Sequence, residues 1–377
     1  MKIMLIQFAG RGGMQLYVSQ LTNALSKENN VSVLLAKHLF NNEYYSSKPK
    51  MLLVTCPPSN LKILFLSLSP WTYLKILRLI KIENPDVIHA PSEFFWIALI
   101  LPFLRTYPFI VTEHDPSLHK GITFIQKLNV SFSRLCTRRR ADAIIVHGNS
   151  LKNLLITKGI SPSKVHVIPH GEFSFYKKWA REEIKESKSI LCFGSIRDYK
   201  GLQFLIEAAS QISNEIPEAR IVIAGEGEFS KYAALISAKE KQAVFEIHNR
   251  FIPDEEVAEL FQKAAVVVLP YTDGSQTGVV PIAYSFGKPV VVTNVGSLAE
   301  AVDEGKTGFI VPPRDSKSLA QALIRLLNDD QLRRAMGKNA LLKVNGVLSW
   351  ESVAEKTLSV YEEALHKKVR PRNDRKN

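Results

Sequence analysis

The chain has 377 residues, 46% of them hydrophobic and 23% charged, which is long enough for two ordinary domains and excludes a disorder-dominated protein. The formal net charge is +13, with 20 Lys and Arg against 8 Asp and Glu in residues 1–170 and 29 against 28 in residues 171–377. The first half is therefore basic, whereas the second half is nearly neutral.

Strand and helix signals alternate through residues 1–172, which we predict to form one domain. The opening segment MKIMLIQFAGRGG is apolar over too short a run for a secretory signal before it reaches glycines, so it predicts a first strand. Stretches with helical spacing, such as QLYVSQLTNALSKE, separate five further short apolar runs: VSVLL, MLLVTC, DVIHA, PFIVTEH and ADAIIVHG. Apolar strands separated by helices indicate a parallel sheet covered on both faces.

The longest later apolar run is FFWIALILPFL at 94–104, with 11 residues. A membrane-spanning helix needs about 20 residues, so we expect no spanning segment. The three cysteines, Cys56, Cys136 and Cys192, are scattered and show no zinc-ligand spacing. We therefore expect buried thiols in a reducing compartment, the cytoplasm.

A polar, charged stretch, FYKKWAREEIKES at 175–187, predicts a linker, and the strand–helix alternation then resumes over 186–349. The strands expected there are SILCFGSI, ARIVIAG, FEIHNRFI, AVVVLP, KPVVVTN and TGFIVP. The chain is thus predicted to hold two doubly wound α/β domains in tandem. Ligands bind at the carboxyl ends of strands in such sheets, so we expect a site in the cleft between the domains. The tail, 369–377, has no apolar periodicity and is expected to be frayed.

Two glycine-containing segments resemble phosphate motifs incompletely. The segment GRGGMQ at 10–15 has Gln15 where the third glycine of a dinucleotide fingerprint would stand, and EGKT at 304–307 lacks the first glycine of a Walker loop. Gly12 and Gly13 nevertheless lie between the first strand and the first helix, where backbone N–H groups can approach a phosphate or a sugar. The alternative for this segment is a tight turn.

The segment FGSIRDYKG places Arg197 and Lys200 just beyond a strand, where their cations can neutralise a diphosphate without a metal. The alternative is a solvated basic turn. His114, in VTEHDP, also directly follows a strand and is either catalytic or structural. The histidines show no metal-ligand pattern and no Asp-x-Asp occurs, so we expect no metal.

The basic charge requires that nucleic-acid binding be considered, but no helix-turn-helix, zinc-finger or RNP-like pattern occurs. The densest basic cluster is the helix ITFIQKLNVSFSRLCTRRR at 122–140, which is amphipathic. Such a helix can lie on an anionic membrane. The alternative is a solvated basic face over an apolar stripe that packs into the core.

These segments together resemble the nucleotide-sugar-dependent retaining glycosyltransferases of family 4, the group 1 type. The resemblance lies in GRGG before QLYVSQLTNAL, VTEHD, VIPHG, FGSIRDYKGLQFLIEAA, IVIAGEGE, LPYTDGSQTGVVPIAYSFGKPVVVTNVGSLAEAV and DEGKTGFIVPP, in that order. It implies the GT-B fold, in which two doubly wound, parallel-sheet Rossmann-like domains face a central cleft. It also implies that SWESVAEKTLSVYEEAL, about 350–368, crosses back onto the N-terminal domain.

In this family the N-terminal domain binds the acceptor and the C-terminal domain binds the nucleotide sugar. The resemblance implies that Lys200 and Arg197 hold the donor diphosphate beside Gly12 and Gly13, and that His114 faces the transferred sugar. The remaining implied donor-binding residues are Gly225, Glu226, Ile252 and Pro253 near the nucleobase, Ser275, Gln276, Thr277, Gly278 and Val279 at a helix N-terminus beneath the phosphates and sugar, and Glu300 in a later turn.

The sequence departs from the family pattern at two glutamates, eight positions apart, whose places are taken by Gly274 and Ile282. The family's proposed front-face reaction tolerates this loss, because the leaving diphosphate itself takes the acceptor proton. We expect a metal-independent hexosyltransferase without cofactor that moves a sugar from a nucleotide-diphosphate sugar to a glycan or lipid-linked acceptor, in cell-surface polysaccharide synthesis. We expect it at the inner face of the cytoplasmic membrane, with no nucleic-acid partner. The alternatives are a catalytically degenerate GT-B scaffold and a nucleotide-sugar epimerase.

Overall fold

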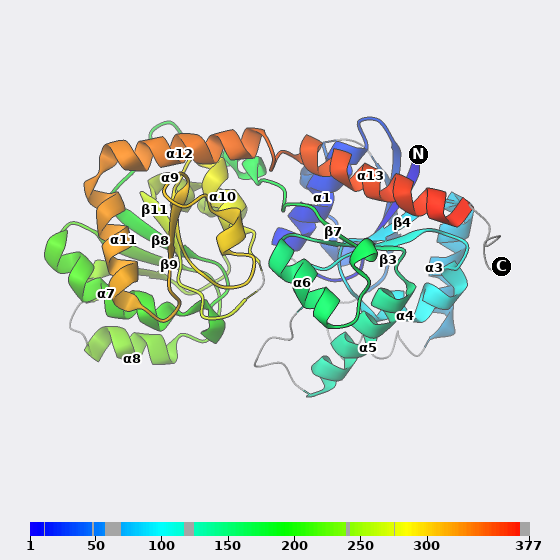
Figure 1. The fold of residues 1–377 in the computed structure, drawn as a ribbon, viewed down its shortest axis with the longest axis horizontal. Helices are drawn as coiled ribbons and strands as arrows, with labels where there is room; N and C mark the ends of the chain where they lie inside the picture. The colour runs from blue at the N-terminus through cyan, green and yellow to red at the C-terminus, as the bar shows by residue number, and fades with distance from the viewer. Residues whose placement is uncertain are drawn as a thin grey trace. The chain divides into compact units, whose positions relative to one another are not determined.

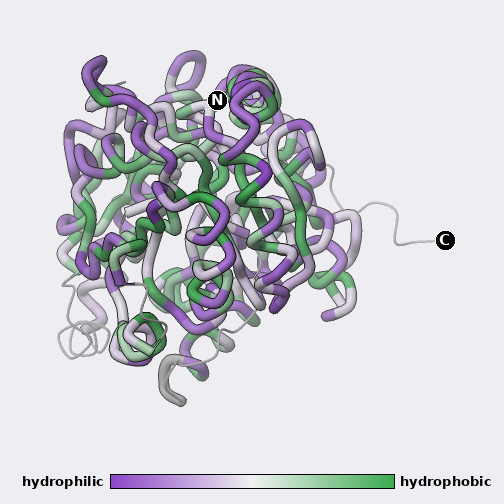
Figure 2. The backbone as a smooth tube through the Cα atoms, turned by 90° about the vertical axis from the view of Figure 1, so that its left-hand side faces the viewer, coloured by the Kyte–Doolittle hydropathy of each residue, from purple (hydrophilic) through white to green (hydrophobic). Residues whose placement is uncertain are grey.

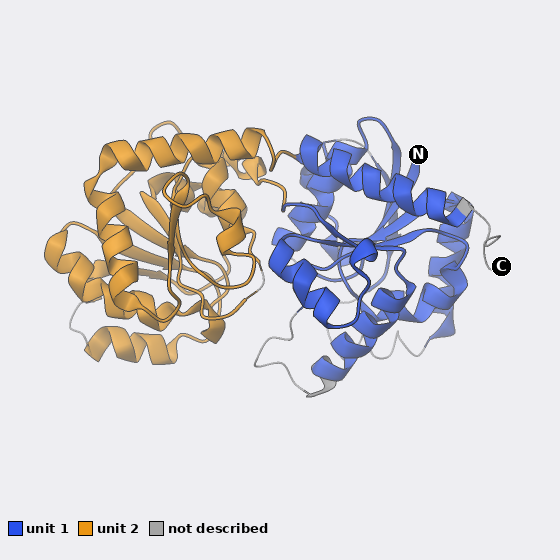
Figure 3. Cartoon of the chain, viewed as in Figure 1, with its two compact units in different colours: residues 1–169, 350–377 blue, residues 170–349 orange. Residues whose placement is uncertain are grey.

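The computed structural model describes residues 1–10, 12–46, 49–56, 69–116, 124–238, 242–274 and 276–369. These residues form two compact units, shown in Figures 1 and 3. Unit 1 comprises Met1–Pro169 and Trp350–Asn377, and unit 2 comprises His170–Ser349. The tail beyond residue 369, which was expected to be frayed, lies outside the described residues.

Unit 1 is built on a parallel sheet, whose described strands have the order β3-β2-β1-β4-β5-β6-β7. Their bounds are β1 Lys2–Gln7, β2 Asn30–Ala36, β3 Lys50–Val54, β4 Val87–Ala90, β5 Phe109–Thr112, β6 Ala143–Val146 and β7 Val165–Val167. The order reverses direction between β1 and β4, as in doubly wound folds. Six of these strands match predicted runs. β7 was not predicted, because it has three residues and is interrupted by His166.

The helices of unit 1 connect these strands and pack on the sheet (Figure 1). They are α1 Gly13–Leu25, α3 Pro70–Glu83, α4 Phe95–Ile100, α5 Phe124–Arg140, α6 Asn149–Thr157 and α13 Trp350–Val369, with 3₁₀ turns η1 Lys37–Leu39, η2 Asn42–Tyr44, η3 Leu101–Leu104 and η4 Pro162–Lys164. Helix α13 packs against α1, and α4 packs against both α3 and α5. The last helix of the chain is therefore part of the first unit.

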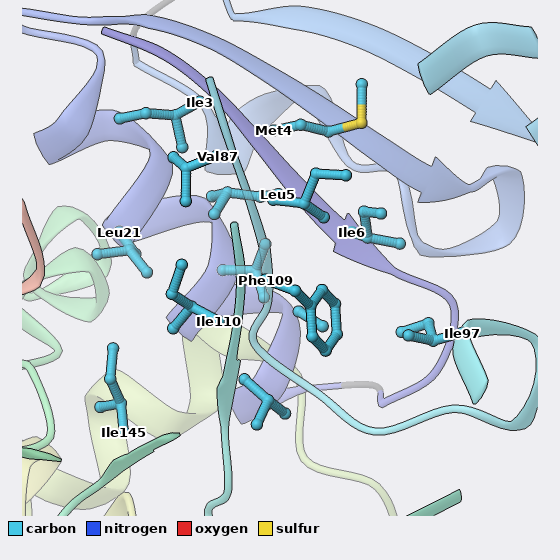
Figure 4. Packing of buried hydrophobic residues seen from close by; sticks show 14 of the residues in the cluster. Ile3, Met4, Leu5, Ile6, Leu21, Val87, Ile97, Phe109, Ile110 and Ile145 are labelled. Carbon is cyan, nitrogen blue, oxygen red and sulfur yellow. The ribbon is translucent and has the colours of Figure 1, made fainter. Parts of the chain in front are cut away.

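The core of unit 1 lies around the central strands. Ile3, Leu5 and Ile6 of β1 are at most 1% exposed, and they pack with residues of β4, β5 and α1 (Figure 4). Burial of such a side chain stabilises the fold by about 1.5–3 kcal/mol. Because both faces of β1 are buried, its sequence is apolar at consecutive rather than alternate positions.

Unit 2 repeats this plan with described strands in the order β10-β9-β8-β11-β12-β13, all parallel. All six correspond to predicted runs. Their bounds are β8 Ser189–Phe193, β9 Arg220–Ala224, β10 Phe245–His248, β11 Val266–Leu269, β12 Val290–Thr293 and β13 Gly308–Val311. Here the order reverses between β8 and β11.

The helices of unit 2 are α7 Leu202–Glu215, α8 Ser230–Ala238, α9 Asp254–Lys263, α10 Val279–Ser285, α11 Ser316–Asn328 and α12 Asp330–Asn345, with 3₁₀ turns η5 Ser174–Trp179, η6 Asp198–Lys200, η7 Gln242–Val244 and η8 Ala299–Ala301. Two aspartates begin consecutive helices: the Asp315 carboxylate accepts from the Ser318 N–H at 2.9 Å and Asp329 accepts from Leu332 at 2.8 Å. Such caps each stabilise a helix by about 1 kcal/mol. Hydrophobic and hydrophilic stretches alternate along the chain in Figure 2, as surface helices require.

The stretch predicted as a linker is instead part of unit 2. Residues Ser174–Trp179 form η5, which packs on α9 and α10, and the Arg181 N–H donates to the Gln262 side chain at 3.0 Å. Just before η5, the Phe173 ring lies against Gly278, so that a Cβ at Gly278 would be 3.0 Å from it. Unit 2 accordingly begins at His170, ahead of the predicted start at 186. Charged residues in this stretch led to the linker prediction, but its aromatic residues pack within unit 2.

Candidate active site

The predicted diphosphate residues lie in unit 2 at the point where its strand order reverses. The loop after β8 carries Arg197 and Lys200, and the loop after β11 runs from Pro270 to Gly278. In doubly wound sheets the crevice between such strands is the usual ligand site, because the loops of the two strands diverge there. The structure thus brings together two segments that are about 75 positions apart in the sequence.

Lys200 is the centre of this arrangement. Its Nζ lies 5.4 Å from the centroid of the Tyr271 ring, and a Cβ on Gly194 would be 2.7 Å from the same nitrogen. Burial lowers the pKa of Lys200, and the nearby charge of Arg197 acts in the same direction. Among the described residues no carboxylate forms an ion pair with it. A half-buried ammonium in such a setting is a candidate for binding a negatively charged ligand.

Gly194 is the residue that makes room for this ammonium. Its φ is +105°, a conformation that favours glycine, and its N–H donates to Ala224 O at 2.8 Å. Val279, the first residue of α10, would lie 3.9 Å from a Cβ at Gly194. The lysine, the glycine and the start of α10 are therefore neighbours, and neither the Gly194 nor the Tyr271 contact was predicted from the sequence.

Backbone hydrogen bonds hold the loops of the site to one another. Thr272 N–H donates to Tyr199 O at 2.7 Å, which joins the loops after β8 and β11. Ile196 N–H donates to Glu226 O at 2.8 Å, which joins the loops after β8 and β9. At Gly201 a Cβ would be 2.0 Å from Pro270 O, so only glycine permits this approach. These contacts hold the loops after β8, β9 and β11 to one another.

The other predicted residues of unit 2 lie around this centre at different depths. Arg197 is exposed and directly precedes η6, the turn that contains Lys200. Gly225 and Glu226 follow β9, and Ile252 and Pro253 follow β10. Ile252 is buried, whereas the Glu226 and Pro253 side chains are exposed. Gly225 N–H donates to His248 O at 3.0 Å, which ties these two loops together.

The predicted helix-start residues follow β11 and lead into α10, whose first residue, Val279, lies near Gly194. Gln276, Thr277 and Gly278 are half-buried, and Thr277 Oγ1 accepts from the Val279 N–H at 3.1 Å. Ser275 lies outside the described residues. Glu300 stands apart in η8, where its carboxylate accepts from Ser297 Oγ at 3.3 Å. Whether these residues bind a donor stays a prediction.

Unit 1 has its own loop at a point of strand reversal. Gly12, with φ +62°, caps α1, and Gly13 is its first residue. A Cβ at either glycine would meet no atom within 4 Å, so the surface there is open. Gln15, which replaces the third fingerprint glycine, accepts from Gly12 N–H at 3.0 Å and donates to Leu39 O at 2.7 Å. Gln15 therefore ties the loop to η1, the turn that follows β2.

His114 follows β5 in unit 1 and is half-buried. Its Nε2 lies 3.1 Å from Pro91 O and its Nδ1 lies 3.0 Å from His147 Nε2. Tyr17 of α1 contacts the His114 ring edge to face, with centroids 4.7 Å apart. His147, which the sequence did not single out, directly follows β6, the same signal that pointed to His114.

Helix α5 exposes apolar side chains, whereas an ordinary surface helix exposes polar ones. Two of its arginines point inward to acidic residues: Arg134 Nε donates to Glu93 at 2.8 Å, and Arg138 binds both oxygens of Glu113 at 2.8 and 2.7 Å. Its outward side carries an apolar row, Leu128 at 55% exposure, Phe132 at 45% and Leu135 at 50%. Figure 1 shows α5 at the outside of unit 1. The alternative of an apolar stripe packed into the core is therefore wrong for these three residues.

Over the residues that the structure describes, no helix has the length and apolarity needed to cross a membrane.

Two Rossmann-like units, each with glycine-containing loops where its strand order reverses, define the GT-B class of glycosyltransferases. Residues 11–171 match Glycosyltransferase Family 4, and residues 176–343 match Glycosyl transferases group 1. The chain belongs to this family 4, group 1 type of glycosyltransferase, as the resemblance predicted.

Relatives and solved structures agree with this assignment. An uncharacterized glycosyltransferase of Methanocaldococcus jannaschii is 26% identical over 309 residues, which is 77% of this chain and 78% of that protein. A D-inositol 3-phosphate glycosyltransferase of Corynebacterium diphtheriae is 27% identical over 77% of this chain and 73% of its own. The structure of Anabaena HepE in complex with UDP and glucose has a TM-score of 0.76 and 18% identity, over 96% of this chain and all of that chain.

Proposed function

We propose that the protein transfers a sugar from a nucleotide-diphosphate sugar to a glycan or lipid-linked acceptor, with retention of configuration. The observation that carries the proposal is the Lys200 ammonium, held between Gly194 and Tyr271 with no carboxylate partner among the described residues. A diphosphate supplies the missing negative charge, and Arg197 on the same turn adds a second cation. The HepE complex, whose title names UDP and glucose, supports a ligand of this chemistry.

The proposed reaction follows from charge stabilisation rather than from a protein nucleophile. An acceptor hydroxyl attacks the anomeric carbon from the side of the leaving group, the bond from that carbon to the diphosphate oxygen breaks, and the proton passes to the diphosphate. Lys200 and Arg197 stabilise the negative charge that develops on the leaving diphosphate. With Gly274 and Ile282 at the positions of the two family glutamates, this course requires neither acid. Gln276 is the side chain we expect to take over contacts to the sugar.

The test is donor turnover by the wild type and two matched lysine variants. Lys200→Met removes the cation after β8, whereas Lys188→Met removes an exposed lysine just before the same strand, where it pairs with Glu218. With a panel of UDP- and GDP-sugars and extracted lipid-linked acceptors, we expect Lys200→Met to lower nucleoside diphosphate release about 100-fold or more. Lys188→Met should match the wild type.

Several outcomes would contradict this proposal. Turnover of a donor without any acceptor would indicate an epimerase, and a donor-induced thermal shift without turnover would indicate a binding scaffold. Equal turnover by Lys200→Met and the wild type would remove the diphosphate role of Lys200. The anomeric configuration of an isolated product, determined by NMR, decides between retention and inversion.

We further propose that unit 1 lies on an anionic membrane through α5. The support is the outward apolar row of Leu128, Phe132 and Leu135, with exposed Lys127 and Arg139 beside it. Apolar side chains of such a helix insert at the headgroup boundary, and each basic group near an anionic surface contributes about 1 kcal/mol. This placement brings unit 1 to the surface where a lipid-linked acceptor is found.

The membrane proposal is tested by sedimentation with phosphatidylglycerol–phosphatidylcholine vesicles. The triple variant Leu128→Ser, Phe132→Ser, Leu135→Ser should lose vesicle binding. Leu342→Ser, on α12 of unit 2 and 62% exposed, is the control and should bind like the wild type. Equal binding by both variants contradicts the proposal. So does a concentration-dependent dimer that the triple variant dissolves, because the row would then serve a second copy of the chain.

A further inference from the structure

Two histidines of unit 1 form a chain of hydrogen bonds that ends on a carbonyl oxygen at each side. His147 Nδ1 lies 2.9 Å from Ile168 O, His147 Nε2 lies 3.0 Å from His114 Nδ1, and His114 Nε2 lies 3.1 Å from Pro91 O. The two ring centroids are 4.6 Å apart. All four ring nitrogens are therefore engaged, and the identity of their partners limits where protons can be.

A carbonyl oxygen accepts hydrogen bonds and cannot donate them. His147 Nδ1 and His114 Nε2 must therefore each carry a hydrogen. If both rings were neutral, the two inner nitrogens would have no hydrogen, and two lone pairs would face each other at 3.0 Å. Turning either ring over would place a carbon where a nitrogen now meets a carbonyl. The contact is a hydrogen bond only if a third proton lies between the rings.

We infer that His114 and His147 share one additional proton and together carry a single positive charge at neutral pH. Two neutral imidazoles hold two protons, and this geometry requires three. A fourth proton would place two N–H groups against each other, so the pair is expected to hold one charge rather than two. His147 is then a positioning residue, which keeps His114 charged and fixes its ring.

His89 provides the internal contrast. It is fully buried in the same unit, with Nδ1 2.6 Å from the Tyr361 hydroxyl and Nε2 2.8 Å from the Thr112 hydroxyl. A hydroxyl can donate or accept, so these partners suit a neutral ring in either tautomer. Burial lowers the pKa of His89 to about 3. Carbonyl partners, rather than the number of partners, distinguish the charged pair from this neutral histidine.

The groups around the pair come from several elements. Tyr17 of α1 packs on both rings and is uncharged, because burial raises the pKa of its hydroxyl. Two acids flank His114 in the chain. Glu113 is paired with Arg138 of α5, and the backbone carbonyl of Asp115 accepts from Arg134 of α5. Lys158 follows α6 and donates to Pro116 O, and α13 contributes the uncharged Trp350.

The N-terminus of α6 near His147 opposes a positive charge on the pair, so the hydrogen bonds of the pair must outweigh this effect. His119 and Lys120 lie outside the described residues.

The direct test is long-range ¹H–¹⁵N NMR of the full chain labelled at histidine, which has nine histidines. His114→Gln and His147→Gln assign the two rings. At pH 7.5 we expect the pair to show the ring-nitrogen shifts of one shared imidazolium, while His89 shows a neutral ring from pH 5 to 9. Two neutral rings at His114 and His147 at pH 7.5 would overturn the inference.

The role of the charge in the reaction rests on the proposed function and needs a second readout. In His147→Gln an amide faces His114, so the third proton is no longer required and His114 should titrate near an ordinary histidine, at about 6.5. Relative to wild type, donor turnover by this variant should then be about 25-fold lower at pH 8 than at pH 6. A ratio that is equal at both pH values would mean that His147 is only structural. Absence of any turnover by the wild type would overturn the proposed function, whereas the NMR result decides the charge independently.

Discussion

Acidification should loosen unit 1 through His89. This histidine lies between Thr112 on β5 and Tyr361 on α13, and burial lowers its pKa from 6.5 to about 3. The unfolded chain takes up a proton below about pH 6.5, but the folded unit does not. Stability from this group is therefore complete above the unfolded pKa and is lost as the pH falls toward 3.

The magnitude follows from the two pKa values. Each pH unit between them costs about 1.4 kcal/mol, so lowering the pH from 7 to 5 should cost about 2 kcal/mol of the free energy of opening unit 1. The assay is amide hydrogen exchange read by mass spectrometry in peptides that cover β4, β5 and α13. Unit 2 contains His170, whose pKa burial also lowers, to about 4, so the readout must be local to unit 1. Within unit 1, burial also lowers the pKa of His166, so only a matched variant isolates His89.

The matched variant is His89→Gln, which can hydrogen-bond both hydroxyls and does not titrate. It should be less stable at pH 7 but should lose about 2 kcal/mol less than the wild type between pH 7 and 5, which is about a 30-fold difference in exchange protection. Parallel losses in the two proteins would refute the reasoning, because the buried ring would then not be the proton-linked group.

Two further substitutions test the loops and α5. Gly194→Ala should cost about 1–2 kcal/mol of stability, similar to Gly305→Ala, whose φ is +71° and whose Cβ would meet nothing within 4 Å. Only Gly194→Ala should abolish donor turnover, because its Cβ displaces the Lys200 ammonium; retained turnover in a folded variant would contradict this. Arg138→Met should cost about 3 kcal/mol, because it leaves its fully buried glutamate partner without a counter-charge. Arg139→Met, at the exposed neighbouring position, should change urea unfolding by less than about 0.5 kcal/mol, and equal effects would show that the buried pair is not the cause.

Local sequence determined most of the strands. The β-branched runs of β9, β11 and β12 are apolar at consecutive positions because they are covered on both faces, and each became a strand. The sequence missed β7, which is too short to give a periodic signal. The sequence also predicted a linker in the stretch where η5 packs its aromatic residues, because charged residues dominate that stretch.

The candidate site was also predictable only where its signal is local in the sequence. Lys200 was identifiable because it lies in the loop just beyond β8, a property that can be read from neighbouring residues. Its setting was not, because Tyr271 comes from a different loop, and the two loops meet only when β8 and β11 pair. The outward apolar row of α5 was equally hidden, since the carboxylates that draw its arginines inward, Glu93 and Glu113, are remote in sequence from the helix.

The return of α13 to unit 1 has a consequence for synthesis on the ribosome. Unit 2 is continuous from His170 to Ser349, so it can fold while unit 1 still lacks its last helix. Chain synthesis proceeds at about 5–20 residues per second, so the N-terminal sheet lacks α13 for at least about ten seconds. During this time His89 cannot reach Tyr361, and the surface of α1 that packs on α13 is uncovered. The first unit to be made is therefore the last to be completed.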